Sequence, residues 1–185
     1  VDFQGAVTTP TLTVTGTATA YNVNSTGTGG TITNAVTFAN TGTLTLGQAA
    51  GTQTYNGGLT ATANSGRTVL GTINSSDDVM TFGAITLGAA TVLDTNALTA
   101  AGDLTIGAVT GATFSLTLDT GHFAGADISG TTVTNVGTLT LRDAGTATFT
   151  GAVNTNTAVA ITDAVTLVDF QGAVTTPTLT VTGTA

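Results

Sequence analysis

Residues 11–20 read TLTVTGTATA, with threonine at every odd position and an apolar residue or glycine at every even position. A period of two is typical of a β-strand that buries one face and exposes the other. Threonine is β-branched and suits the exposed side of a pleated surface. Similar strings occur at 43–46 (TLTL), 115–118 (SLTL) and 138–141 (TLTL). The alternation predicts an all-β chain built from short strands.

The same sequence stands at both ends of the chain. Residues 1–18 and residues 168–185 both read VDFQGAVTTPTLTVTGTA, at an offset of 167. Chance does not produce an identity of this length. The chain is therefore interpreted as one tandem unit, residues 1–167, followed by the start of the next identical unit, residues 168–185. We expect both ends to be cuts within a longer array, and the second copy to lie in the same environment as the first, one unit along.

A shorter repeat runs inside the unit. The motif Phe-x-Gly-Ala-Val supplies the candidate structural residues, which are Phe3, Gly5, Phe149, Gly151, Phe170 and Gly172. Weaker copies occur at 82–85 and 106–109, and the spacings are near multiples of about 21 residues, within the range of solenoid repeats. We expect the phenylalanines to point into the core and the glycines to lie at turns.

Short strands separated by Gly, Asn and Asp, in a repeat of this length, predict a parallel β-helix, or β-solenoid, with about eight rungs per 167-residue unit. Its interior should hold Val, Leu, Ile, Ala and the seven phenylalanines, while outward Thr and Asn side chains form ladders along the axis. A β-propeller is the main rival. Its blades need about 40 residues each, and its cyclic closure fits poorly with an open tandem array.

The composition excludes several kinds of partner. Charged residues make up 6% of the chain, and the formal net charge is −8. The sequence contains two arginines, Arg67 and Arg142, and no lysine. A basic patch for nucleic acid cannot be built from them. Cysteine is absent, so neither a disulfide scaffold nor a thiolate metal site is expected. No run of 18 apolar residues occurs, and we expect the chain not to be membrane-embedded.

The Phe-x-Gly-Ala-Val and Thr-Leu-Thr-Val/Leu strings, the bias toward Thr, Ala, Gly and Asn, and the lack of Cys and Lys resemble the repeat regions of large bacterial surface proteins. The families are the filamentous-haemagglutinin-like adhesins and the passenger regions of autotransporters. The resemblance covers the whole chain through degenerate motifs. It implies secretion, a right-handed β-helix, and a structural or adhesive role at the cell surface.

Two groups of residues are candidates for chemistry. The lone His122 lies near Asp119 and Asp127, and Ser115 or Ser129 would complete a Ser-His-Asp triad. No nucleophile-elbow motif accompanies them, so we predict a solvated turn histidine and no enzyme.

The second group consists of aspartates, which could offer oxygen ligands to Ca²⁺. Its members are Asp77, Asp78, Asp94 and Asp103. The calcium β-roll and EF-hand motifs are both missing, so we predict turn capping, no cofactor and at most weak calcium binding.

Thr-x-Thr triplets raise an alternative function. They occur at 11–19, 43–45, 52–54 and 138–140. Stacked on one flat face they would resemble the ice-binding surface of a β-solenoid antifreeze protein, although their spacing is irregular. A polysaccharide-binding adhesin module is a further alternative.

The sequence as a whole predicts a structural segment of a long extracellular β-solenoid fibre at a bacterial cell surface, giving length and stiffness and some adhesion. The expected partners are copies of the same chain, as adjacent units, by head-to-tail stacking or by lateral bundling.

Overall fold

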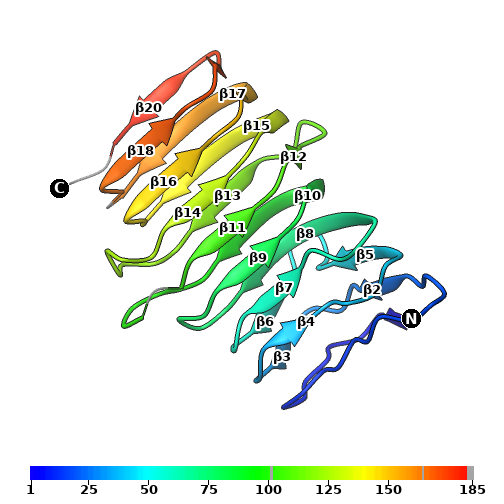
Figure 1. Ribbon diagram of the computed structural model, residues 1–185. Coiled ribbons are helices and arrows are strands. Elements are labelled where there is room, and N and C mark those ends of the chain that lie inside the picture. The colour runs from blue at the N-terminus through cyan, green and yellow to red at the C-terminus, as the bar shows by residue number, and fades with distance from the viewer. Residues whose placement is uncertain (101, 164, 183–185) are drawn as a thin grey trace.

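A computed structural model describes residues 1–100, 102–163 and 165–182 (Figure 1). These residues form strands β1–β20 and no helix. The strands pair in parallel and wind into a solenoid of about eight turns. The predicted fold class, an all-β parallel β-helix, is confirmed. None of the described residues belongs to a helix that could cross a membrane.

The paired strands form three stacks along the axis. Stack I contains β1 (Asp2–Phe3), β2 (Val23–Ser25), β5 (Thr43–Leu46), β12 (Val109–Thr110), β19 (Val174–Thr175) and the first parts of β8 (Gly66–Asn74), β10 (Ile85–Asp94), β15 (Val133–Arg142) and β17 (Val153–Thr162). Stack II contains β3 (Gly30–Ile32), β6 (Thr52–Tyr55), β13 (Leu116–Asp119), β20 (Leu179–Val181) and the second parts of the same four long strands. Stack III contains β4 (Val36–Thr37), β7 (Leu59–Ala61), β9 (Met80–Phe82), β11 (Leu104–Ile106), β14 (Ile128–Gly130), β16 (Thr146–Phe149) and β18 (Leu167–Phe170).

The turns differ in length although the stacks stay in register. In stack I, the shortest turn runs from Thr68 to its register partner Thr86, and the following turn, from Thr86 to Thr110, is clearly longer. The extra residues are taken up in loops such as that between Asp94 and Leu104. Because loops on the surface tolerate insertions, the number of strands per turn is preserved while the turn length varies.

The two-residue alternation places apolar side chains in one continuous core. In β8, positions alternate between buried and half-buried along the whole strand, and Val69 and Ile73 are fully buried. Outward threonines stack in stack III, where Thr37, Thr60, Thr81 and Thr105 lie in register. The core therefore consists of the inward faces of many short strands, none of which could bury its apolar side alone.

Two phenylalanines depart from the expected interior. Phe123 is half-buried in the loop between β13 and β14, outside the core cluster, and Phe114 lies on the surface. Phe114 is 39% exposed, so the prediction that all seven phenylalanines are internal is wrong. Phe114 lies in the turn between β12 and β13, directly after Ala112 and Thr113, which both have positive φ. Two successive left-handed residues carry the chain out of the strand direction, and the ring is placed on the surface.

The two copies of the repeated segment lie on different stacks. At the N-terminal end, Phe3 pairs with Ser25 on stack I, Thr9 with Ile32 on stack II, and Val14 with Phe38 on stack III. At the C-terminal end, β18 lies on stack III, β19 on stack I and β20 on stack II. Within the chain, every part of the second copy is therefore displaced by one stack relative to the first.

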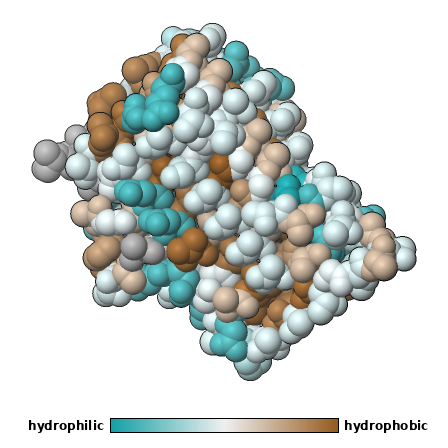
Figure 2. Space-filling view, in the orientation of Figure 1, coloured by the Kyte–Doolittle hydropathy of each residue, from teal (hydrophilic) through white to brown (hydrophobic). Residues whose placement is uncertain are grey.

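The last turn exposes a cluster of apolar side chains. The exposed fraction is 55% for Leu167, 39% for Val174, 57% for Leu179 and 67% for Val181. Figure 2 shows hydrophobic atoms gathered at this end of the stack, at the upper left, where C marks the terminus in Figure 1. Within the part of the chain that the structure describes, no further turn packs on these side chains.

Candidate functional site

A row of charged side chains lies at the end of stack II. Asp94 is in register with Asp119, and Asp119 is in register with Arg142. Each follows a buried leucine on its strand, namely Leu93, Leu118 and Leu141. Because side chains alternate along a strand, the residue after an inward leucine points outward. Three consecutive turns thus place two carboxylates and one guanidinium side by side.

Arg142 neutralises the middle carboxylate of this row. Its Nε donates to Asp119 Oδ2 at 2.5 Å, and its Nη2 contacts the same oxygen. The Asp119 side chain is only 6% exposed, against 41% for that of Arg142. Burial, followed by the negative charge of Asp119, raises the pKa of Asp94 above its usual value. The row contains more negative charge than its single arginine balances.

An open hollow of about 400 Å³ lies beside the row. Its lining residues are Asp94, Asn96, Leu98, Asp119, Gly121, His122, Arg142, Asp143 and Asp163. Asn96, Gly121, Asp143 and Asp163 all have positive φ, so successive turns pass through left-handed corners at this point. Asn, Asp and Gly tolerate that conformation better than other residues. The hollow is therefore polar partly because the left-handed backbone at these corners favours Asn, Asp and Gly.

The structure places His122 with a different partner from the one proposed. Its Nδ1 lies 3.0 Å from Asp143 Oδ1, and its side chain is 72% exposed. Ser115 is engaged elsewhere, since its hydroxyl oxygen accepts a hydrogen bond from the Thr138 amide. Ser129 lies in the middle of β14, on stack III. The structure brings together a histidine and an aspartate at the surface, and it places the two candidate serines in other strands.

The aspartates considered for calcium are used by the backbone. The amides of Leu98 and Thr99 and the hydroxyl of Thr99 donate to the Asp77 carboxylate, and the hydrogen bond from Leu98 is the main cause of its lowered pKa. Asp94 accepts from the Asn96 amide at 2.7 Å, and Asp103 accepts from the Asp127 amide at 2.9 Å. Asp78 is an exposed residue of the loop before β9.

Over the ranges that the structure describes, no group of three or more His, Asp, Glu or Cys side chains could hold a metal ion. The carboxylates cap turns, a role for which Asp is well suited.

The residues of the Phe-x-Gly-Ala-Val motif lie at the core and at corners. Phe149 is fully buried and stacks on Phe170, with ring centroids 5.7 Å apart, whereas Phe3 and Phe170 are half-buried in the outermost turns. Gly151 and Gly172 lie over one another, because a Cβ on Gly172 would meet the Gly151 carbonyl at 2.4 Å.

Gly5 occupies the bend between stacks I and II in the first turn, whereas Gly151 and Gly172 lie between stacks III and I. It lies against Gly27, whose added Cβ would lie 2.0 Å from the Gly5 oxygen. Successive backbones approach so closely at these corners that a side chain has no space between them.

Arg67 is a buried arginine that donates to backbone carbonyls. It is 9% exposed, its Nη1 donates to the Ala84 carbonyl at 3.1 Å, and its Nη2 donates to the Thr62 carbonyl. Burial lowers its pKa. Its guanidinium lies directly beneath Gly83, whose missing side chain leaves the space. Arg67 therefore fills a corner of the solenoid and is not part of the surface row.

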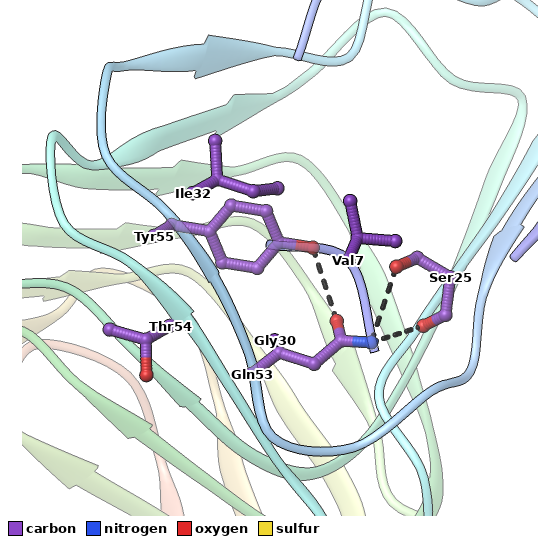
Figure 3. Close-up of a pocket in the computed structure, with 7 residues that line it drawn as sticks. All are labelled: Val7, Ser25, Gly30, Ile32, Gln53, Thr54 and Tyr55. Atoms are coloured by element: carbon purple, nitrogen blue, oxygen red, sulfur yellow. Dashed lines mark hydrogen bonds between the residues drawn. The ribbon is translucent and has the colours of Figure 1, made fainter. Parts of the chain in front are cut away.

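A second, much smaller cavity lies near the N-terminal end (Figure 3). It measures about 10 Å³, which is room for roughly one water molecule. Gln53 Nε2 donates to the Ser25 carbonyl and hydroxyl oxygens and to the Gly27 carbonyl, while its Oε1 accepts from Tyr55. Burial raises the pKa of Tyr55. This polar cluster satisfies itself, and the cavity is too small for an organic ligand.

Sequence reasoning did not find the Asp94–Asp119–Arg142 row. A signal for it was present, because Asp119 and Arg142 directly follow the strings 115–118 and 138–141 that marked equivalent strands. When the two strings are aligned, the residues that follow them are also aligned, so Asp119 is paired with Arg142. Asp94 follows Val92 and Leu93 without a threonine repeat, so its place in the row required the register of β10.

Replacing Arg142 with glutamine should lower the free energy of unfolding at pH 7 by about 2–3 kcal/mol, because the buried Asp119 carboxylate then faces Asp94 without its cation. Urea denaturation measures the loss, and Arg142→Lys, which keeps the positive charge, should recover part of it. A loss as large for Arg142→Lys as for Arg142→Gln would contradict the electrostatic origin.

Asp94→Asn is the matched control. A carboxyl with a raised pKa contributes stability while protonated, below its unfolded pKa, and that contribution is lost as pH rises through the folded pKa. Removing the Asp94 charge should therefore leave the protein at least as stable as the unsubstituted chain at pH 7.

Comparison with known proteins identifies no relative: no family model matches the chain, and no curated protein or solved structure matches it significantly.

Proposed function

We propose that the chain is a structural segment of a long extracellular β-solenoid fibre on a bacterial surface, where it supplies length and stiffness. The observation that carries this proposal concerns the two ends. The first turn pairs through its strands with the turn that follows it, and the last turn pairs through the same sequence with the turn that precedes it. One segment thus has partners on both of its sides.

The organisation of the core supports a rod. Each turn hydrogen-bonds to its neighbours through three parallel ladders, and the buried side chains form one continuous cluster from Val23 to Val159. Bending such a rod would have to stretch ladder hydrogen bonds on one side and compress the core on the other. Stiffness is therefore a direct consequence of the stacking.

The polar groups also support a structural role. The surface carboxylates mostly accept from backbone amides at turns, and the buried Asn64 amide donates to the carbonyl and side-chain oxygens of Asn40 in the preceding turn. These contacts connect successive turns. We accordingly propose no enzymatic activity, and we propose copies of the chain itself as partners, because a solenoid end exposes unpaired strand edges.

The arrangement of threonine does not favour the ice-binding alternative. The triplet 43–45 lies on stack I, whereas 52–54 and 138–140 lie on stack II. On stack II, the register position of Thr54 is occupied in the following turns by other residues, namely Asn74, Asp94, Asp119 and Arg142. A flat grid of two threonine columns is therefore not formed on either stack.

Chains with two and four consecutive units test the proposal by electron microscopy. Neighbouring strands lie about 4.8 Å apart, so four units should give straight rods about 150 Å long, with end-to-end distances close to the contour length. Kinked or compact particles would overturn the proposal. Faceting of growing ice crystals by the same protein would favour the ice-binding alternative, and loss of the strand signal in chelator would favour a calcium-dependent fold.

A further inference from the structure

The exposed last turn of the chain has a specific surface that would pack against it, the turn that begins at β2. Val174, Leu179 and Val181 of the last turn are exposed, whereas their sequence equivalents Val7, Leu12 and Val14 in the first turn are half-buried against the core. Val7 lies beside Ser25, Gly30 and Ile32, and Val14 pairs with Phe38, so part of this cover comes from the turn that begins at β2. In a tandem array, a second copy of that same turn follows residue 185 and is the natural occupant of the exposed end.

The way this occupant sits is fixed by two observed registers. Residues 168–181 are held on stacks III, I and II by the preceding turn. The same sequence at the N-terminal end places β2 on the stack that carries Asp2 and Phe3. If both contacts are kept, β2 of the next unit lies over β18, on stack III of the first unit, and not on stack I.

We infer that consecutive units of the fibre are rotated by one stack about the solenoid axis, so that stack I of each unit continues stack III of the unit before it. This inference rests on the proposed fibre. Seven full turns along stack I lead from β1 to β17, and β18 lies two stacks further on. One unit therefore spans seven and two-thirds turns, and three units are needed before a surface feature returns to the same side.

Turn lengths support the rotated arrangement. In it, Asp169 pairs with Asn24 of the next unit, which repeats the observed pairing of Asp2 with Asn24. The unrotated alternative would place Val23 of the next unit over Val174, the equivalent of Val7. The chain from Val7 to Val23 is shorter than the chain from Thr68 to Thr86, which forms the shortest stack I turn in the structure. The unrotated turn would therefore be shorter than every stack I turn that the structure describes.

The rotation has a consequence for recognition. The hollow beside Asp119 and His122 lies on stack II, so in the next unit it would lie above stack I of the first. Successive hollows would be about 37 Å apart along the axis and a third of the circumference apart around it. The fibre would present this acidic surface on all sides, in a helical path, and not along one edge.

Cysteine cross-linking in a two-unit chain, made of residues 1–167 followed by the full 185-residue chain, tests the rotation. The natural sequence has no cysteine, and neighbours on adjacent parallel strands lie within the Cα separation that a disulfide accepts. Counting continuously through the two units, one variant combines Asp169→Cys at the junction with the Asn24→Cys substitution of the second unit. Another combines Thr175→Cys at the junction with the same Asn24→Cys substitution. Thr148→Cys with Asp169→Cys, which are register partners in the structure, is the positive control.

The rotated array predicts that the Asp169 pair oxidises as completely as the control pair and that the Thr175 pair stays reduced. Oxidation of the Thr175 pair, or of neither pair while the control oxidises, would overturn the inference. The particle shape is read separately by scattering. An extended particle with the Thr175 cross-link contradicts only the rotation, whereas a compact particle contradicts the fibre itself.

Discussion

Replacing Phe149 with alanine should lower the free energy of unfolding by about 3–5 kcal/mol, the range for truncating a buried phenylalanine. The ring is fully buried, stacks on Phe170 and occupies the space beneath Gly130, whose added Cβ would lie 2.6 Å from it. The backbone ladders on either side hold the turns apart, so the cavity cannot collapse easily. Urea denaturation followed by circular dichroism measures the loss.

Phe114→Ala is the matched control for this substitution. Phe114 is 39% exposed in a turn, so its truncation should cost less than about 1 kcal/mol. Equal losses at the two positions would contradict the inside and outside assignments made from the register.

Replacing Gly47 with alanine should destabilise the protein by about 4 kcal/mol or more, or prevent folding. Gly47 has φ of +88°, and a Cβ built there would lie 1.9 Å from the Leu70 carbonyl oxygen of the next turn. The atom it meets is backbone, between the two paired parts of β8 that end at Val69 and resume at Gly71 and Thr72, so relief would require a shift of the main chain of one turn. The yield of folded protein and its urea midpoint report the effect.

Gly29→Ala separates the two causes of this loss. Gly29 also has positive φ, at +79°, but an added Cβ would meet nothing within 4 Å. Its substitution should cost only the backbone strain, about 1–2 kcal/mol. If both substitutions had the same effect, close packing of turns at the corner would not be the reason for glycine at position 47.

Much of the fold could be predicted because the signals are local. Alternation in strings such as 43–46 and 138–141 identifies buried and exposed faces directly. Four of the five copies of the Phe-x-Gly-Ala-Val motif also mark one kind of corner, whereas the copy at 3–7 lies between stacks I and II. At 149–153 and 170–174 the motif carries the chain from stack III to stack I, and the weaker copies at 82–85 and 106–109 do the same. The spacing of these corners gave the length of the turn.

Register over longer distances could not be predicted in the same way. The loops from Asp94 to Leu104 and from Asp119 to Ile128 lengthen their turns without adding a strand to a stack. A residue count therefore does not give the number of turns in a unit, and the displacement of the repeated segment by one stack stayed hidden. The charged row has the same origin, since Asp94 meets Asp119 only after a turn that contains the first of these loops.

In the proposed fibre, the chain adds length to a rod of constant cross-section. Small-angle X-ray scattering from chains of one, two and four units tests this claim most directly. We predict that the maximum dimension grows by about 37 Å for each added unit, since seven and two-thirds turns advance about 4.8 Å each, while the cross-sectional radius of gyration stays unchanged. A cross-section that widens as units are added, with a maximum dimension that grows by much less, would contradict it.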